Sequence, residues 1–127
     1  MASIKIRDHE YEYSAKDVIS FDEGLIGFPS VRQAVVVEMN GFEPFCWMAS
    51  IDNEQEHFVV VDPSRFFDTY RPFGEDARML AIVKVATDWR ATTVNLRAPV
   101  RIDSVTGRAR QVILSDTDYQ FSESLGA

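Results

Sequence analysis

Apolar and polar residues alternate with a period of two along much of the chain, which is the pattern of half-buried β-strands. Near the N-terminus, Ile4 and Ile6 share one face of such a strand. The same alternation recurs in "FCWMASI" over residues 45–51 and in "NLRAPVRID" over residues 95–103. Runs rich in β-branched residues at 56–62 and 79–86, and the stretch "DVISF", predict further strands. We expect Phe45, Trp47 and Phe58 to fill the core.

The connections between these strands are short. Proline suits the first helical position, so one or two helical turns are predicted at "PSVRQ" (29–33) and "PSRFFDTY" (63–70). "DSVTG" indicates a turn, and "RARQVIL" the returning strand. Short strands punctuated by Gly and Pro predict an all-β fold, an antiparallel barrel or sandwich. Pro99 lacks an N–H and therefore belongs at a strand edge or at a bulge, where a barrel strand turns a corner.

One turn, at residues 19–29, is unusually rich in apolar residues, and we call it the oily turn. The stretch "ISFDEGLIGFP" sets Gly24 and Gly27 among large apolar residues. We expect both glycines to supply a positive φ or a close backbone approach, so a side chain at either position should destabilise the fold. Leu25, Ile26 and Phe28 are then expected to fold back over an open end of the barrel and cap its core.

Length and composition fit one globular domain over residues 1–127. The N-terminus lacks the apolar core of a signal peptide, and no apolar run approaches a membrane span. Cys46 is the single cysteine, so no internal disulfide can form, and we expect a cytoplasmic protein. Thirteen basic and twenty acidic residues give a net charge of −7, which argues against nucleic-acid binding.

The charges are unevenly distributed. Six acids and no Lys or Arg lie between Glu38 and Asp62, and four arginines cluster further on. These arginines are Arg97, Arg101, Arg108 and Arg110. A solvated surface and a polar partner interface both explain the segregation. Direct RNA binding by the arginines is a third reading, which the total charge disfavours.

Signatures of enzymes are nearly absent. His9 and His57 lie far apart and outside any metal-binding motif, so we expect surface residues. No basic residue flanks Cys46 in the sequence to lower its pKa, which predicts a packed thiol rather than a nucleophile. "DNEQE" lacks the glycine and the spacing of a calcium loop and is expected to be a hairpin tip. We therefore expect no catalytic residue, metal or cofactor.

Aromatic residues are more informative. The loop "RFFDTYRPF" holds Phe66, Phe67, Tyr70 and Phe73, which form either a buried plug or an exposed patch for a protein partner. Tyr70 is the strongest interface candidate, because its hydroxyl suits a wet boundary. The acidic residues Glu43, Asp52, Glu54 and Glu56 are candidates for the same interface. Asn95 and Gln111 are expected to lie on neighbouring strands of a hairpin and to act structurally, by bonding to backbone groups at a bulge or turn.

Four blocks of sequence, in order over residues 4–119, resemble the bacterial flagellar assembly factor family FliW. They are "FDEGLIGF", with Ile26 where proline is usual, "PFCWMASID", "HFVVVDPSRFFDTY", and "TTVNLRAPVRID" followed by "GRARQVILSDTDY". The segment "RPFGEDAR" and the C-terminal tail are shorter than is usual in the family.

The resemblance implies a small antiparallel β-barrel without catalytic activity. Members of this family bind the RNA-binding regulator CsrA, which relieves repression of flagellin synthesis, and they also bind flagellin. It thus implies these two partners, and we expect a monomer. The alternative is a small-ligand-binding barrel or enzyme with a pocket at the barrel mouth. A pull-down that returns CsrA or flagellin discriminates between the two readings.

Overall fold

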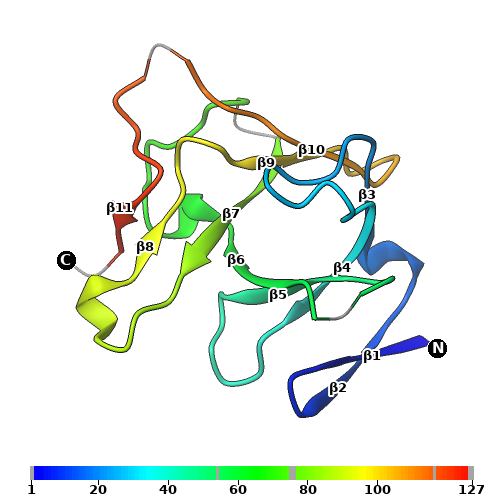
Figure 1. The fold of residues 1–127 in the computed structure, drawn as a ribbon. Helices are drawn as coiled ribbons and strands as arrows, with labels where there is room; N and C mark the ends of the chain where they lie inside the picture. The colour runs from blue at the N-terminus through cyan, green and yellow to red at the C-terminus, as the bar shows by residue number, and fades with distance from the viewer. Residues whose placement is uncertain (1, 54, 75–76, 116, 126–127) are drawn as a thin grey trace.

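The computed structural model describes residues 2–53, 55–74, 77–115 and 117–125 of the chain (Figure 1). Regular structure in these ranges is almost entirely β. The strands are β1 (Ala2–Ile6), β2 (His9–Tyr13), β3 (Val18–Phe21), β4 (Gln33–Glu38), β5 (Cys46–Ser50), β6 (His57–Val61), β7 (Arg78–Lys84), β8 (Thr93–Val94), β9 (Val100–Ile102), β10 (Arg108–Gln111) and β11 (Glu123–Ser124). Three short 3-10 turns are η1 (Ala15–Asp17), η2 (Pro63–Arg65) and η3 (Trp89–Ala91). Within the same ranges, no helix is long and apolar enough to cross a membrane.

A barrel closes through β3, β4, β5, β6, β7, β9 and β10 in that order, because β9 pairs with β7 and β10 pairs with β3. The predicted antiparallel barrel is confirmed, with one exception. β10 and β3 run parallel, with Arg108 opposite Ser20 and Ala109 opposite Phe21. A ring of seven strands cannot alternate direction throughout, because seven is odd, so one pair must be parallel. The seam falls where the last barrel strand meets the first.

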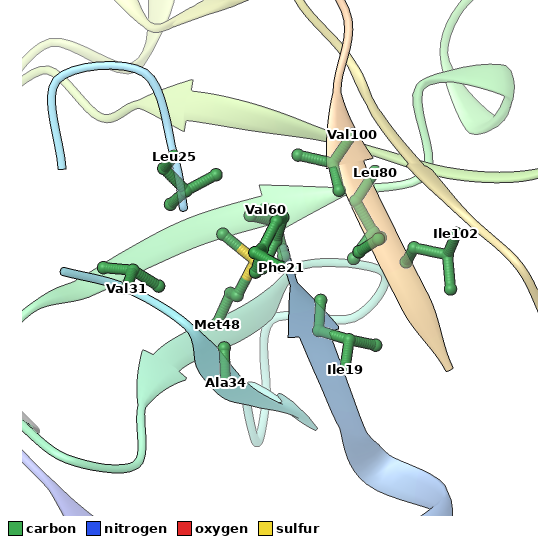
Figure 2. Close-up of a cluster of buried hydrophobic side chains, with 11 residues drawn as sticks. Ile19, Phe21, Leu25, Val31, Ala34, Met48, Val60, Leu80, Val100 and Ile102 are labelled. Carbon is green, nitrogen blue, oxygen red and sulfur yellow. The ribbon is translucent and has the colours of Figure 1, made fainter. Parts of the chain in front are cut away.

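The barrel interior is filled by a cluster of buried side chains (Figure 2). Its members are Ile19, Phe21, Leu25, Val31, Ala34, Met48, Val60, Leu80, Val100, Ile102 and Ala109. They come from every barrel strand, as the period-two pattern requires. These side chains occupy the space that a small ligand inside the barrel would need.

The outer face of β5 is also buried. Trp47 and Ala49 face away from the interior and pack with Ile4 and Ile6 of the β1–β2 hairpin, which lies beside β4 and β5 (Figure 1). Met48, between them, faces inward. The alternation of the two faces of β5 was predicted correctly, but the cluster that each face packs against was not. Trp47 fills this outer cluster rather than the barrel, and Phe45 and Phe58 are only half-buried.

A third cluster covers β7 and β8. It contains Val61, Tyr70, Met79, Ala81, Val83, Val94 and Leu96. The aromatic loop after η2 and the C-terminal segment, through Tyr119 and Leu125, pack against it. β11 pairs with β8, which pairs with β7, so the end of the described chain returns to the barrel wall (Figure 1).

The oily turn is built as expected at its glycines. Gly24 and Gly27 have φ of 74° and 85°, and Leu25 and Phe28 exchange backbone hydrogen bonds of 3.2 and 2.9 Å. Leu25 is buried in the interior cluster. The rest of the expected lid is wrong: Ile26 is 54% exposed and Phe28 43%, since the tight turn leaves only one side chain facing inward. Phe28 instead lies edge-on against Phe58, with ring centroids 5.0 Å apart.

The expected helical turns are half right. Pro63 begins η2, and the Asp62 carboxylate caps it by accepting from the Ser64 N–H at 3.0 Å. Pro29 begins no helix, because the chain turns there and enters β4 at Gln33. Pro99 directly precedes β9, so its missing N–H removes no bond from that strand, and its carbonyl accepts from the Val112 N–H at 2.9 Å.

Candidate protein-binding surface

The aromatic loop divides between the core and the surface. Phe66 is exposed, Phe67 and Phe73 are half-buried against the cluster over β7, and Tyr70 is fully buried. Of the two alternatives predicted from the sequence, the buried plug therefore describes Tyr70 and the exposed patch describes Phe66. Only Phe66 keeps a large exposed apolar surface.

Tyr70 is wrongly interpreted as a surface ring. Its hydroxyl donates to the backbone carbonyl of Leu96 at 2.5 Å, and its ring lies edge-on against Tyr119 at 4.7 Å. Burial raises the pKa of Tyr70, with a smaller contribution from Tyr119. The polar end that suggested a wet boundary is satisfied by backbone instead, which fixes the loop to the segment after β8.

Phe66 belongs to an aromatic surface that we did not predict from the sequence. Its ring is 5.6 Å from that of Phe45, which meets Trp89 edge-on at 6.5 Å. Phe42 is 64% exposed and Trp89 52%. Phe42, Phe45, Val85 and Trp89 line an open groove of about 450 Å³, the aromatic groove, and Phe66 contacts it through Phe45. Its other lining residues are Arg7, Met39, Trp47, Val59, Val83, Ala86, Thr87 and Thr92.

Two tight connections carry the exposed aromatic residues of the groove. The β4–β5 turn is closed by hydrogen bonds from Phe42 N–H to the Met39 carbonyl and from Phe45 N–H to the Phe42 carbonyl, both 2.9 Å. On the opposite wall, Trp89 begins η3, and the Asp88 carboxylate caps that turn. The signal that could have found these residues is a bulky apolar side chain within a polar turn, in "NGFEP" and "TDWRA".

Arg7 is the charged residue among those that line the aromatic groove. Its guanidinium lies over the Trp47 ring, 5.4 Å from the centroid, so it is held at the rim by a cation–π contact. Glu43 is exposed and follows Phe42 in the turn. The groove thus combines an apolar floor with a polar edge, as protein interfaces do.

The predicted acidic surface is not continuous. Glu43 precedes β5 while Asp52 and Glu56 follow it, and a five-residue strand spans about 17 Å. Asp52 is exposed, and Glu56 accepts hydrogen bonds from Ser30 Oγ and Asn53 Nδ2, which tie the β5–β6 turn together and to the residues after the oily turn. Glu54 lies outside the described residues.

Asn95 and Gln111 both bond to backbone, as expected, and both hold Ala98. The Asn95 side-chain oxygen accepts from the Ala98 N–H at 2.9 Å, and the Gln111 amide donates to the Ala98 carbonyl at 3.1 Å. The Gln111 oxygen also accepts from the Ile26 N–H at 2.9 Å. Gln111 ends β10, whereas Asn95 lies between β8 and β9 rather than in a hairpin strand. Gln111 therefore anchors the oily turn to the closing seam of the barrel.

The sequence also singled out the Cys46 thiol and the two histidines, His9 and His57. Burial raises the pKa of the Cys46 thiol and Glu38 raises it further, while Arg78, close in space though not in sequence, lowers it less. His9 is exposed, and His57 is half-buried with its ring edge-on to Trp47 at 5.3 Å. In the described part of the chain, no three His, Cys, Asp or Glu residues gather as a metal site would require.

The fold and this surface define a class of protein: a closed β-barrel with a filled interior, in which exposed Phe42, Val85 and Trp89 line one groove suited to a protein partner. Comparison with known protein families shows which family within this class the chain belongs to. The family model "FliW protein" matches residues 4–125, so the chain belongs to the FliW family of flagellar assembly factors.

Individual relatives agree with this assignment. The flagellar assembly factor FliW of Syntrophotalea carbinolica is 32% identical, over 98% of both chains, and that of Bacillus velezensis is 30% identical, over 97% of this chain and 96% of the other. A crystal structure of the flagellar assembly factor FliW superimposes with a TM-score of 0.86 at 27% identity, covering 99% of this chain and 98% of the other. The resemblance found in the four sequence blocks is confirmed.

Proposed function

We propose that this flagellar assembly factor acts in the cytoplasm, without catalysis, by binding the translational regulator CsrA and flagellin. Occupation of CsrA relieves its repression of flagellin synthesis, and free flagellin competes for the factor. Membership of the FliW family supports this assignment, and the aromatic groove is the observation in this chain that fits a protein-binding role.

The groove has the composition of an interaction site. Exposed aromatic rings in a shallow apolar cleft supply large contact area with little conformational freedom to lose, which is why they dominate interface energies. Trp89 and Phe42 are the proposed anchors, with Phe66 beside them and Arg7 and Glu43 at the polar edge. Of the residues first proposed for partner contact, Phe66 and Glu43 lie next to the groove, whereas Asp52 and Glu56 lie at the other end of β5.

The net charge of −7 gives the proposal a second element. An acidic protein attracts a basic RNA-binding partner at long range, and once bound it repels RNA phosphates. This electrostatic effect does not require a continuous acidic patch, because the whole charge distribution contributes to the potential.

The test is calorimetric titration of the wild type, Trp89→Ala and Phe42→Ala with purified CsrA and, separately, with purified flagellin. We expect each variant to weaken at least one partner by roughly tenfold or more, as for interface anchors. Val105→Ala is the matched control, because Val105 is an almost fully exposed apolar residue in the β9–β10 turn, away from the groove. If the wild type binds neither CsrA nor flagellin, the proposed function is refuted. If both groove variants bind as the wild type does, only the assignment of the aromatic groove as the binding site is refuted.

A further inference from the structure

Four arginines converge on a second groove, of about 490 Å³, on another part of the barrel. Arg78 begins β7, Arg101 is in β9, and Arg108 and Arg110 are in β10. We call this the basic groove. Asp22 and Asp103 also line it. Three of the arginines belong to the cluster that the sequence singled out, whereas Arg97 points elsewhere, donating to the Leu114 carbonyl at 2.7 Å.

The strand pairing forces like charges together. Arg101 lies directly opposite Arg110 in the antiparallel β9–β10 pair, and Arg108, two residues away, shares the outward face of β10. Like charges directly opposite each other destabilise a sheet. The chain nevertheless places three guanidinium groups on this small area.

Carboxylates of the described residues form no close ion pair with these arginines: in that part of the chain the ion pair within 4.0 Å is Arg90 with Asp88, away from this groove. Arg101 lies close enough to Asp103 to lower the pKa of that carboxyl, as the smallest of its causes. Asp103 is engaged in its own turn, accepting from the N–H groups of Val105 and Thr106 at 2.9 and 3.3 Å, which lowers its pKa. Arg101 lies over the Phe73 ring, 5.3 Å from the centroid, a contact that orients the guanidinium and leaves its N–H edge available.

We propose that the basic groove binds the carboxylate side chains of an acidic segment of a partner protein. Planar guanidinium groups match carboxylates with two parallel hydrogen bonds, and the groove volume lies in the range of ordinary ligand sites. An RNA strand fits less well, because Asp22 and Asp103 interrupt the basic surface and the whole chain carries −7. This site is separate from the aromatic groove and does not depend on which partner that groove takes.

The test uses a labelled eight-residue peptide of alternating Glu and Gly, with the Gln-for-Glu peptide and an eight-nucleotide uridine RNA as comparators. Binding is measured by fluorescence anisotropy at low and at physiological salt. We expect the Glu peptide to bind more tightly than either comparator, with affinity that falls as salt is added.

The decisive variant is Arg101→Gln with Arg110→Gln, which removes the like-charge pair and should fold at least as stably as the wild type. It should weaken the Glu peptide by about tenfold or more. The control, Lys5→Gln with Arg65→Gln, changes the net charge equally at exposed positions outside the groove and should change affinity by less than about twofold. The proposal is overturned if wild type does not bind the Glu peptide, if the Gln peptide or the RNA binds as tightly, or if the two double variants behave alike.

Discussion

Gly24 and Gly27 share a positive φ but differ in the space around them, which makes them a matched pair for separating backbone strain from steric exclusion. A Cβ built on Gly24 would lie 2.5 Å from the Pro29 carbonyl oxygen and 2.7 and 2.8 Å from its Cα and carbonyl carbon. A Cβ on Gly27 would meet nothing within 4 Å. The structure therefore predicts unequal effects for the same substitution.

For Gly27→Ala, the left-handed conformation costs about 1–2 kcal/mol, partly offset by about 0.4–1 kcal/mol from the reduced freedom of the unfolded chain. The net loss is about 1 kcal/mol. Gly24→Ala carries the same terms plus a clash with backbone atoms, which cannot move aside as a side chain can. Relief must displace Pro29, two residues before the buried Val31. Overpacking of this kind costs about 1–3 kcal/mol, so we expect a total of about 2–4 kcal/mol.

Thermal and urea unfolding measure the difference. With about 2.1 cal/mol/K of unfolding entropy per residue, 1 kcal/mol corresponds to roughly 4 °C in a domain of this length. Gly24→Ala should lower the Tm by about 8–16 °C and Gly27→Ala by about 4 °C. Equal shifts would refute the steric argument and leave only the shared backbone term. If both variants melt at the wild-type temperature, neither position requires glycine.

Four further predictions follow from named contacts. Gln111→Ala and Asn95→Ala should each lower unfolding free energy by about 1 kcal/mol, with partner affinity unchanged once folded; full stability with lost binding in a titration would contradict the structural role. Tyr70→Phe leaves the buried Leu96 carbonyl unsatisfied and should cost about 1–3 kcal/mol in urea unfolding, whereas unaltered stability with lost CsrA binding would make Tyr70 an interface residue. Because burial raises the Cys46 pKa, the thiol should react slowly with a thiol reagent at pH 8 and quickly in denaturant, and stability should fall as pH rises past the unfolded thiol's pKa; equal reaction rates would contradict this. Association with CsrA, followed by stopped flow, should slow as salt is added, and a salt-independent rate would exclude electrostatic steering.

Local features of this fold could be predicted from sequence because their causes are local. The period of two fixed which residues of each strand share a face, and two glycines in an apolar turn indicated positive φ. The amides of Asn95 and Gln111 found backbone partners for the same reason that buried polar groups generally do.

The predictions that were wrong concern contacts between segments that are distant in the chain. The pattern in β5 cannot reveal that the β1–β2 hairpin covers its outer face, so Trp47 was placed in the wrong cluster. Tyr70 was taken for a surface ring because the C-terminal segment that covers it lies about fifty residues later. The acidic residues looked contiguous because sequence distance hides the strand that separates Glu43 from Asp52.

Three of the four blocks that carry the family resemblance meet at one place in the structure. The oily turn reaches Gln111 through the Ile26 N–H, Gln111 and Asn95 both hold Ala98, and Tyr70 holds the neighbouring Leu96 carbonyl. Gln111 ends β10, the strand whose parallel pairing with β3 closes the barrel.

These hydrogen bonds therefore explain how the barrel closes rather than what it binds. Exposed Phe42, Val85 and Trp89 of the aromatic groove lie in connections that take no part in these hydrogen bonds. The basic groove is lined by exposed arginines beside the core residues Ile102 and Ala109. Exposed residues can change without disturbing the interior packing, whereas Asn95, Gln111 and Tyr70 cannot change without losing the hydrogen bonds that close the barrel. Under the two proposals made above, the grooves set the choice of partner, and substitutions of their exposed residues should alter binding while leaving the melting temperature almost unchanged.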